Sequence, residues 1–144
     1  MTGSYVLILQ LPKQQIINIG SLANVCFPGG YYAYVGSARG EIRPRLSHHL
    51  DRNKKLHWHI DYLLQKATIT DIIVSEAEGR VECIIVQALS AQFDSIPGFG
   101  CSDCRCLSHL FFAPEKRQMK STIMSTLKSL AMSPKLMGLR GNQK

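Results

Sequence analysis

Nothing in the sequence comes close to the roughly 20 consecutive apolar residues that a membrane-spanning helix needs, so we expect no membrane partner. The start of the chain also lacks the basic end, apolar stretch and small-residue cleavage site of a signal peptide. Acidic residues are few: the chain has 10 acidic and 17 basic residues, which gives a formal net charge of +7. These features favour a cytoplasmic protein with an anionic partner, and nucleic acid is the leading candidate.

Disulfides are not indicated either. The chain has five cysteines, an odd number, and three of them lie close together at 101, 104 and 106. That pattern suits reduced thiols or a metal site better than a disulfide framework. With 144 residues, 45% of them apolar and 19% charged, the chain can form one domain that buries its own core without disulfide bonds.

The apolar patterns predict an α+β fold with a small central antiparallel sheet flanked by helices. β-Branched and aromatic runs predict three core strands, and Gly and Pro breakers predict an inserted hairpin at about residues 14–28. The expected strands are 3–11, 31–35 and 67–77, and the expected helices are about 44–51, 80–93 and 114–132. Residues 57–65 are too short for periodicity to decide between a short helix, which we favour, and the end of a strand. Residues 1–113 form the main domain, with a Cys-rich segment at 101–109. A basic amphipathic helix follows at 114–132, and 133–144 are expected to be a disordered tail.

One stretch, YYAYVGSARGEIRPRLSHHL, combines a Tyr-rich strand with a helix that carries Arg45 and His49 four residues apart. Residues at this spacing share a helix face. A tight turn at Gly36 would bring Tyr34 close to that face. The guanidinium of Arg45 binds phosphate oxygens in a fork, so the expected cluster suits a phosphodiester.

Phosphodiester cleavage also calls for a divalent cation, which a single carboxylate can hold together with substrate phosphate. Glu82, within the apolar run VECIIV, is the best candidate because the helix after the third strand packs back on the sheet. Glu76 and Glu78 lie close by in sequence and stay open as alternatives.

The residues GSYVL at 3–7 and YVG at 34–36, followed by Arg45, His49 and Glu82, resemble the GIY-YIG nuclease superfamily. The longer phrases GYYAYVGSA, HWHIDYLL and GFGCSDCRCLSHLFF resemble its small stand-alone branch, the Uri-like endonucleases. This resemblance spans residues 3–112. It implies an endonuclease with one divalent ion, Mg²⁺ or Mn²⁺, a central three-stranded antiparallel sheet and DNA as the preferred substrate.

The resemblance also implies roles for individual residues. Tyr5 and Tyr34 would order the attacking water, and one of them, with or without help from His49, would act as base. Arg45 would stabilise the phosphate and Glu82 would bind the metal. We also expect nucleic-acid contacts from the residues around the end of the second core strand and the start of the next helix: Gly36, Ser37, Arg39 and Arg43.

The chain departs from the superfamily pattern in two places. Ser4 stands where the motif name has isoleucine, and Tyr34 follows Tyr5 at a longer separation than is typical, which the inserted hairpin would absorb.

Other readings remain. Taken singly, a strand tyrosine is usually a packing residue and a helical arginine is usually solvated, so the alternative function is a non-catalytic nucleic-acid-binding module on the same fold. The segment HWHID either binds metal or anchors the core. The Cys-rich segment offers soft zinc ligands or a packed turn; as a zinc site it would use Cys101, Cys104, Cys106 and His109. Oligomeric state cannot be predicted.

Overall fold

The fold, taken from a computed structural model, is described here for residues 3–38, 42–51, 53–75, 81–101 and 106–137. Three long antiparallel strands form its centre: β1 (Gly3–Leu11) lies between β4 (Gly30–Ala38) and β5 (Thr68–Ser75). This arrangement confirms the predicted α+β class and its three core strands. The inserted hairpin is present as β2 (Gln15–Asn18) and β3 (Asn24–Phe27).

Three short strands extend the central sheet on both sides. They are β6 (Asp94–Ser95), β7 (Leu110–Ala113) and β8 (Lys135–Met137), and the full order is β6-β7-β4-β1-β5-β8. None of the three is predicted from the sequence, because two to four residues are too few to show an alternating pattern. The expectation of a tail without structure from residue 133 is wrong for β8, which pairs with β5.

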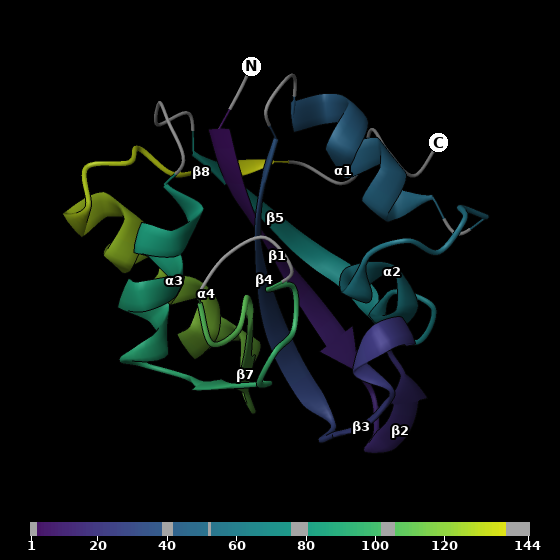
Figure 1. Cartoon of the computed structure of the whole chain (residues 1–144). Helices are drawn as coiled ribbons and strands as arrows, with labels where there is room; N and C mark the ends of the chain where they lie inside the picture. Colours follow the sequence, from purple (N-terminus) through teal and green to yellow (C-terminus); the bar gives the residue numbers. More distant parts are fainter. Residues whose placement is uncertain (1–2, 39–41, 52, 76–80, 102–105, 138–144) are drawn as a thin grey trace.

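Helices cover both faces of the sheet (Figure 1). On one face lie α1 (Ile42–Leu50), α2 (His59–Leu63) and the β2–β3 hairpin, and on the other lie α3 (Glu82–Ser90) and α4 (Lys116–Ser129). The central strand β1 is therefore apolar on both sides. Tyr5, Leu7 and Leu9 point into the first core, whereas Val6 and Ile8 point into the second.

The helices form where their sequences allow it. Pro44 is the third residue of α1, within the first turn, where a missing backbone N–H costs nothing. In α4, buried Met119, Ile123 and Leu127 recur at helical spacing and face the sheet. Its opposite face is basic, but Lys116 and Lys120 form ion pairs with Asp71 of β5 at 3.4 and 3.1 Å. Among the described residues, no helix is both long enough and apolar enough to cross a bilayer.

The second core strand is longer than expected. The prediction of a turn at Gly36 is wrong, since β4 continues to Ala38 while paired with β1, with Gly36 opposite Tyr5 and Ala38 opposite Gly3. Gly36 has a different role, which the site geometry explains.

Candidate active site

Gly36 is the position that accommodates the phenol ring of Tyr5. Tyr5 lies on the face of β1 that looks toward α1, and its neighbour across the ladder is Gly36. A Cβ atom at position 36 would lie 2.5 Å from Tyr5 Cζ and 2.6 Å from its hydroxyl oxygen. Any side chain at position 36 would therefore displace the ring.

The phenol of Tyr5 is hydrogen-bonded to the imidazole of His49, with the oxygen 2.7 Å from Nε2. The ring of Tyr34 contacts the same imidazole edge-on, with centroids 6.2 Å apart. Three of the residues predicted from the sequence therefore lie together between β1, β4 and α1. Tyr5 is 1% exposed, and Tyr34 is partly buried.

His49 occupies the buried face of α1 rather than a face beside it. The four-residue spacing predicts Leu46 and Leu50 as the buried stripe, with Arg45 and His49 on the adjacent face. Leu46 is buried and Leu50 is partly buried against the same core, as expected, but His49 is buried as well, together with Ile42. Positions 42, 46 and 49 follow the four- and three-residue steps of a single face.

Burial controls the ionisation of this cluster. Desolvation, and after it the charge of Lys54, lowers the pKa of His49 to about 3, so the imidazole is neutral at pH 7. Desolvation also raises the pKa of Tyr5 and of Tyr34 well above the ordinary value for a phenol, so both are protonated. The positive charge of Arg45 opposes that rise for each of them.

Arg45 is held by an aromatic contact. Its guanidinium carbon lies 4.6 Å from the centroid of the Trp58 ring, in a cation–π contact, and its positive charge acts on the pKa of the Tyr5 phenol. Trp58 is thus a residue of the site that sequence reasoning assigned only to the core. The sequence signal that could have identified it is that Trp58 is the single tryptophan of the chain and lies in the phrase HWHID.

The segment around Trp58 anchors the structure. The buried carboxylate of Asp61 accepts backbone hydrogen bonds from His57 and Trp58 at 2.9 and 2.8 Å through Oδ2. His59 accepts the backbone N–H of Gly100 at Nδ1. Among the described residues, none of these side chains belongs to a group of three possible metal ligands. The hydrogen bonds of Asp61 and His59 therefore favour a structural anchor over a metal site for this segment.

Glu82 approaches from the other layer of the fold. It begins α3, and its Oε1 accepts a hydrogen bond of 3.0 Å from the hydroxyl of Ser37 near the end of β4. Its Oε2 lies 3.7 Å from Nδ1 of His109. The negative charge of Glu82 also contributes to the raised pKa of both phenols, Tyr5 and Tyr34. The charge of Glu82, held near the end of β4, therefore acts on both phenols, although α1 and α3 cover opposite faces of the sheet.

The other predicted residues are distributed unevenly. Gly36 is buried under Tyr5, Ser37 is bonded to Glu82, and Arg43 is exposed on α1. The remaining predicted positions, Arg39, Glu76, Glu78 and Cys104, lie outside the described residues.

The described residues contain donors for two kinds of metal. Glu82 is 27% exposed and offers carboxylate oxygens, the hard ligands that Mg²⁺ and Mn²⁺ take. Among the described residues, one group of soft ligands lies together: the donor atoms of Cys83, Cys106 and His109 are all within 4.8 Å of one another. Two of the four predicted zinc ligands belong to that group. Cys101 does not, and Cys83 was missed because only the folded chain brings α3 beside this segment.

Comparison with known proteins gives one match. The family model described as domain of unknown function DUF123 matches residues 4–132, which include the candidate site and all four helices of the described chain. No curated protein and no solved structure matches the chain.

Proposed function

Since the chain belongs to the DUF123 domain family, a GIY-YIG-like family, we propose that it is a metal-dependent endonuclease that hydrolyses phosphodiester bonds of DNA. Within the superfamily we assign it to the Uri-like stand-alone branch, because the phrases GYYAYVGSA and HWHIDYLL resemble that branch. The observation that carries the proposal is the contact between Tyr5 and His49. The positive charge of Arg45 and the negative charge of Glu82, which belongs to the other layer, both act on the pKa of the same phenol.

In the proposed reaction Tyr5 and His49 move one proton. With the imidazole proton on Nδ1, the phenol of Tyr5 donates to Nε2 of His49. A water attacks phosphorus and the bond to the leaving oxygen breaks, while the water gives a proton to the Tyr5 oxygen and the phenol proton passes to Nε2. Because burial lowers the pKa of His49 to about 3, the imidazolium then releases this proton to solvent, and the raised pKa of Tyr5 keeps the phenol from forming a stable phenolate.

Arg45 stabilises the charge that develops on the phosphate. The planar fork of its guanidinium can reach two phosphate oxygens. The contact with Trp58 restricts its conformations before substrate binds, so less entropy is lost when the bidentate contact forms.

Glu82 would hold the divalent cation, and Ser37 orients the carboxylate through Oε1. The fit rests on the donor chemistry: a partly exposed carboxylate, with water and substrate phosphate completing the oxygen set. A bound Mg²⁺ or Mn²⁺ ion would neutralise charge on the phosphate and on the leaving oxygen.

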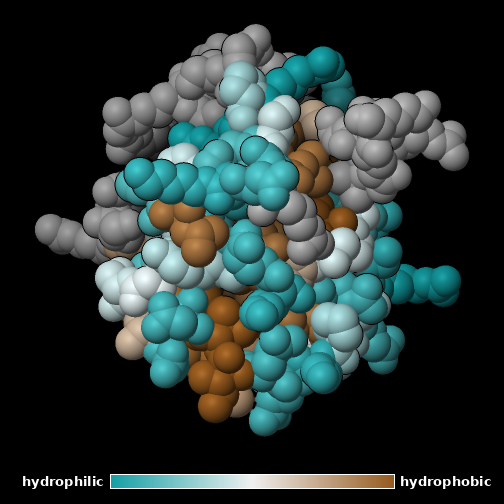
Figure 2. Space-filling view, turned by 90° about the vertical axis from the view of Figure 1, so that its right-hand side faces the viewer, coloured by the Kyte–Doolittle hydropathy of each residue, from teal (hydrophilic) through white to brown (hydrophobic). Residues whose placement is uncertain are grey.

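The surface over α1 and α2 suits a polar partner. Figure 2 shows this face as mostly hydrophilic, with apolar side chains gathered into a few separate patches. Arg43 is exposed on α1, and the chain as a whole carries a formal charge of +7, which favours a phosphate backbone.

The test is a cleavage screen with the purified chain on linear, nicked and branched DNA and on RNA, with Mg²⁺ or with a chelator. We expect Mg²⁺-dependent cleavage of at least one DNA, and we expect the Glu82→Ala variant to cleave at least about a hundredfold more slowly. Glu115→Ala, which removes a carboxylate outside the site, is the matched control and should cleave normally. Equal cleavage by the wild-type protein and the Glu82→Ala variant would rule out the assignment of the metal ligand.

The burial of Tyr5 favours a second candidate, because a phenol that is 1% exposed is poorly placed to meet a substrate. This candidate is a nucleic-acid-binding module without catalysis. It predicts binding that weakens steeply with salt and no metal-dependent cleavage in the same screen.

A further inference from the structure

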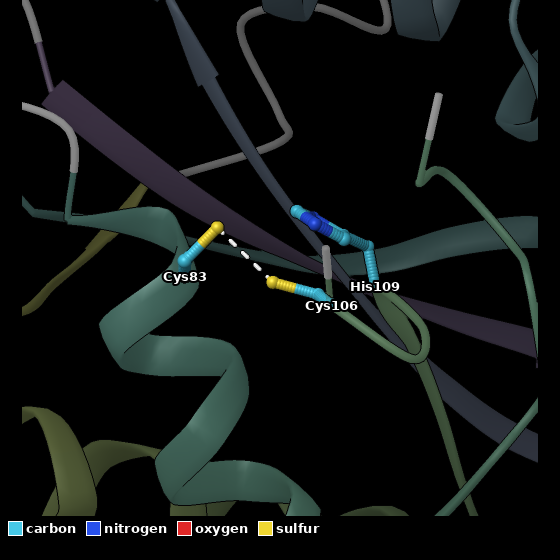
Figure 3. A group of neighbouring side chains, drawn as sticks. All are labelled: Cys83, Cys106 and His109. Carbon is cyan, nitrogen blue, oxygen red and sulfur yellow. Dashed lines mark hydrogen bonds between the residues drawn. The ribbon is translucent and has the colours of Figure 1, made fainter. Parts of the chain in front are cut away.

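A second group of potential ligands lies next to the candidate active site. The sulfur of Cys83 on α3 and the sulfur of Cys106, four residues before β7, point toward each other and are 3.0 Å apart (Figure 3). The His109 ring lies beside them, and one of its nitrogens is within 4.8 Å of both sulfurs. These three side chains come from two segments that are more than twenty residues apart in sequence.

The chemistry of the three donors is that of a soft metal site. Thiolates and an imidazole suit Zn²⁺, whereas Mg²⁺ and Mn²⁺ prefer oxygen. His109 is 3% exposed, and its Nδ1 lies 3.1 Å from the carbonyl oxygen of Val35. Donation to that carbonyl places the ring proton on Nδ1 and leaves the lone pair on Nε2. A backbone carbonyl that fixes the second nitrogen in this way is the usual partner of a metal-bound histidine.

We propose that Cys83, Cys106 and His109 bind one zinc ion that joins the first turn of α3 to the segment leading into β7. Two sulfurs on a tetrahedral zinc ion, at a Zn–S distance of about 2.3 Å, lie about 3.8 Å apart. The sulfurs therefore separate by slightly less than 1 Å when the ion binds, a movement that partly buried cysteine side chains make by small χ1 rotations. Among the described residues, these three supply the ligands of the tetrahedral ion.

The zinc ion would act as a positioning element for Glu82. Glu82 directly precedes Cys83 in α3, and its Oε2 lies 3.7 Å from Nδ1 of His109. A zinc ion bound by Cys83 and His109 would hold the Glu82 carboxylate near the end of β4. The zinc site does not depend on the proposed nuclease activity, since metal binding is measured without substrate.

The experiment measures zinc binding by the full chain, produced without a histidine tag and kept reduced. We expect one zinc per chain by elemental analysis, and Co²⁺ in its place should give thiolate-to-metal charge-transfer bands. Cys83→Ser and Cys106→Ser should each weaken zinc binding at least about tenfold. Mutation of a residue that only hydrogen-bonds a metal ligand already lowers metal affinity by about this factor. Cys26→Ser, which changes an exposed cysteine on β3, is the matched control and should bind as the wild type does.

Three results would overturn the proposal. The first is reduced protein that takes up no zinc and gives no thiolate–cobalt bands. The second is unchanged zinc affinity in Cys83→Ser and Cys106→Ser, with loss of binding in Cys101→Ser, which would place the ion elsewhere. The third is a Cys83–Cys106 disulfide, found by intact mass in protein purified without oxygen. Circular dichroism of the zinc-free variants checks that each substitution leaves the fold in place.

Discussion

At the scale of single residues, the most unusual group is the imidazole of His49. It is 3% exposed, hydrogen-bonded to a phenol and close to the ammonium of Lys54, and it has a pKa lowered to about 3. Lys54 donates hydrogen bonds to the carbonyl oxygens of His48 and His49, which holds its charge at the end of α1. The fold therefore keeps His49 uncharged, as the proposed proton transfer from Tyr5 requires.

This burial predicts a pH dependence of stability. The pKa of His49 in the folded chain lies below the unfolded value of 6.5, so between these values the unfolded chain binds a proton and the folded chain does not. The contribution of neutral His49 to the free energy of unfolding is therefore complete above pH 6.5. It is lost as the pH falls from 6.5 toward 3, at about 1.4 kcal/mol per pH unit. Urea unfolding at several pH values should show a slope in this window that is shallower in His49→Gln and unchanged in His57→Gln, an exposed site. Parallel curves for the wild type and His49→Gln would contradict the buried neutral imidazole.

At the scale of elements, the sheet depends on short edge strands. β8 pairs with β5 through the register Ile72 with Met137 to Val74 with Lys135, and so covers an edge that would otherwise leave backbone groups unpaired. On the other side, β7 pairs with β4 through Tyr34, and His109 continues the pairing by accepting the backbone N–H of Val35. The segment that leads into β7 thus carries His109 to the site.

The contribution of β8 can be measured with two shortened chains. A chain that ends at Met137 keeps β8, and a chain that ends at Pro134 loses it. We expect the second chain to lose about 1 kcal/mol or more of unfolding free energy relative to the first, because several ladder hydrogen bonds disappear. Chemical denaturation of both chains checks this. Equal midpoints would show that the strand adds nothing to stability.

The elements differ in how well the sequence predicts them. GSYVLILQL predicts β1 to the residue, because β-branched and aromatic residues run up to a proline. LFFA in β7 has no alternation, and its assignment depends on a partner strand that is distant in sequence. Gly36 appears as a turn residue in the sequence, and only the register against Tyr5 explains why a larger side chain does not fit there.

At the scale of the whole molecule, the candidate site joins two layers. Tyr5, Tyr34, Arg45 and His49 belong to the layer of α1, and Glu82 belongs to the layer of α3. The sequence predicts these five residues, but not the contact of Arg45 with Trp58 or the place of Cys83 beside Cys106. Both depend on helix packing that no local pattern encodes.

The central claim is that side chains from both layers act as one hydrolytic centre, and a double-mutant cycle of the cleavage rate tests it most directly. Tyr5→Phe and Glu82→Gln each keep the shape of the side chain and remove one chemical function. In single-turnover cleavage with Mg²⁺ we predict a loss of about a hundredfold or more for each variant. We also predict that the double variant is little slower than the slower single variant, because groups that act together are not additive. A double variant whose loss equals the product of the two single losses, or a Tyr5→Phe variant that cleaves at the wild-type rate, would contradict the account.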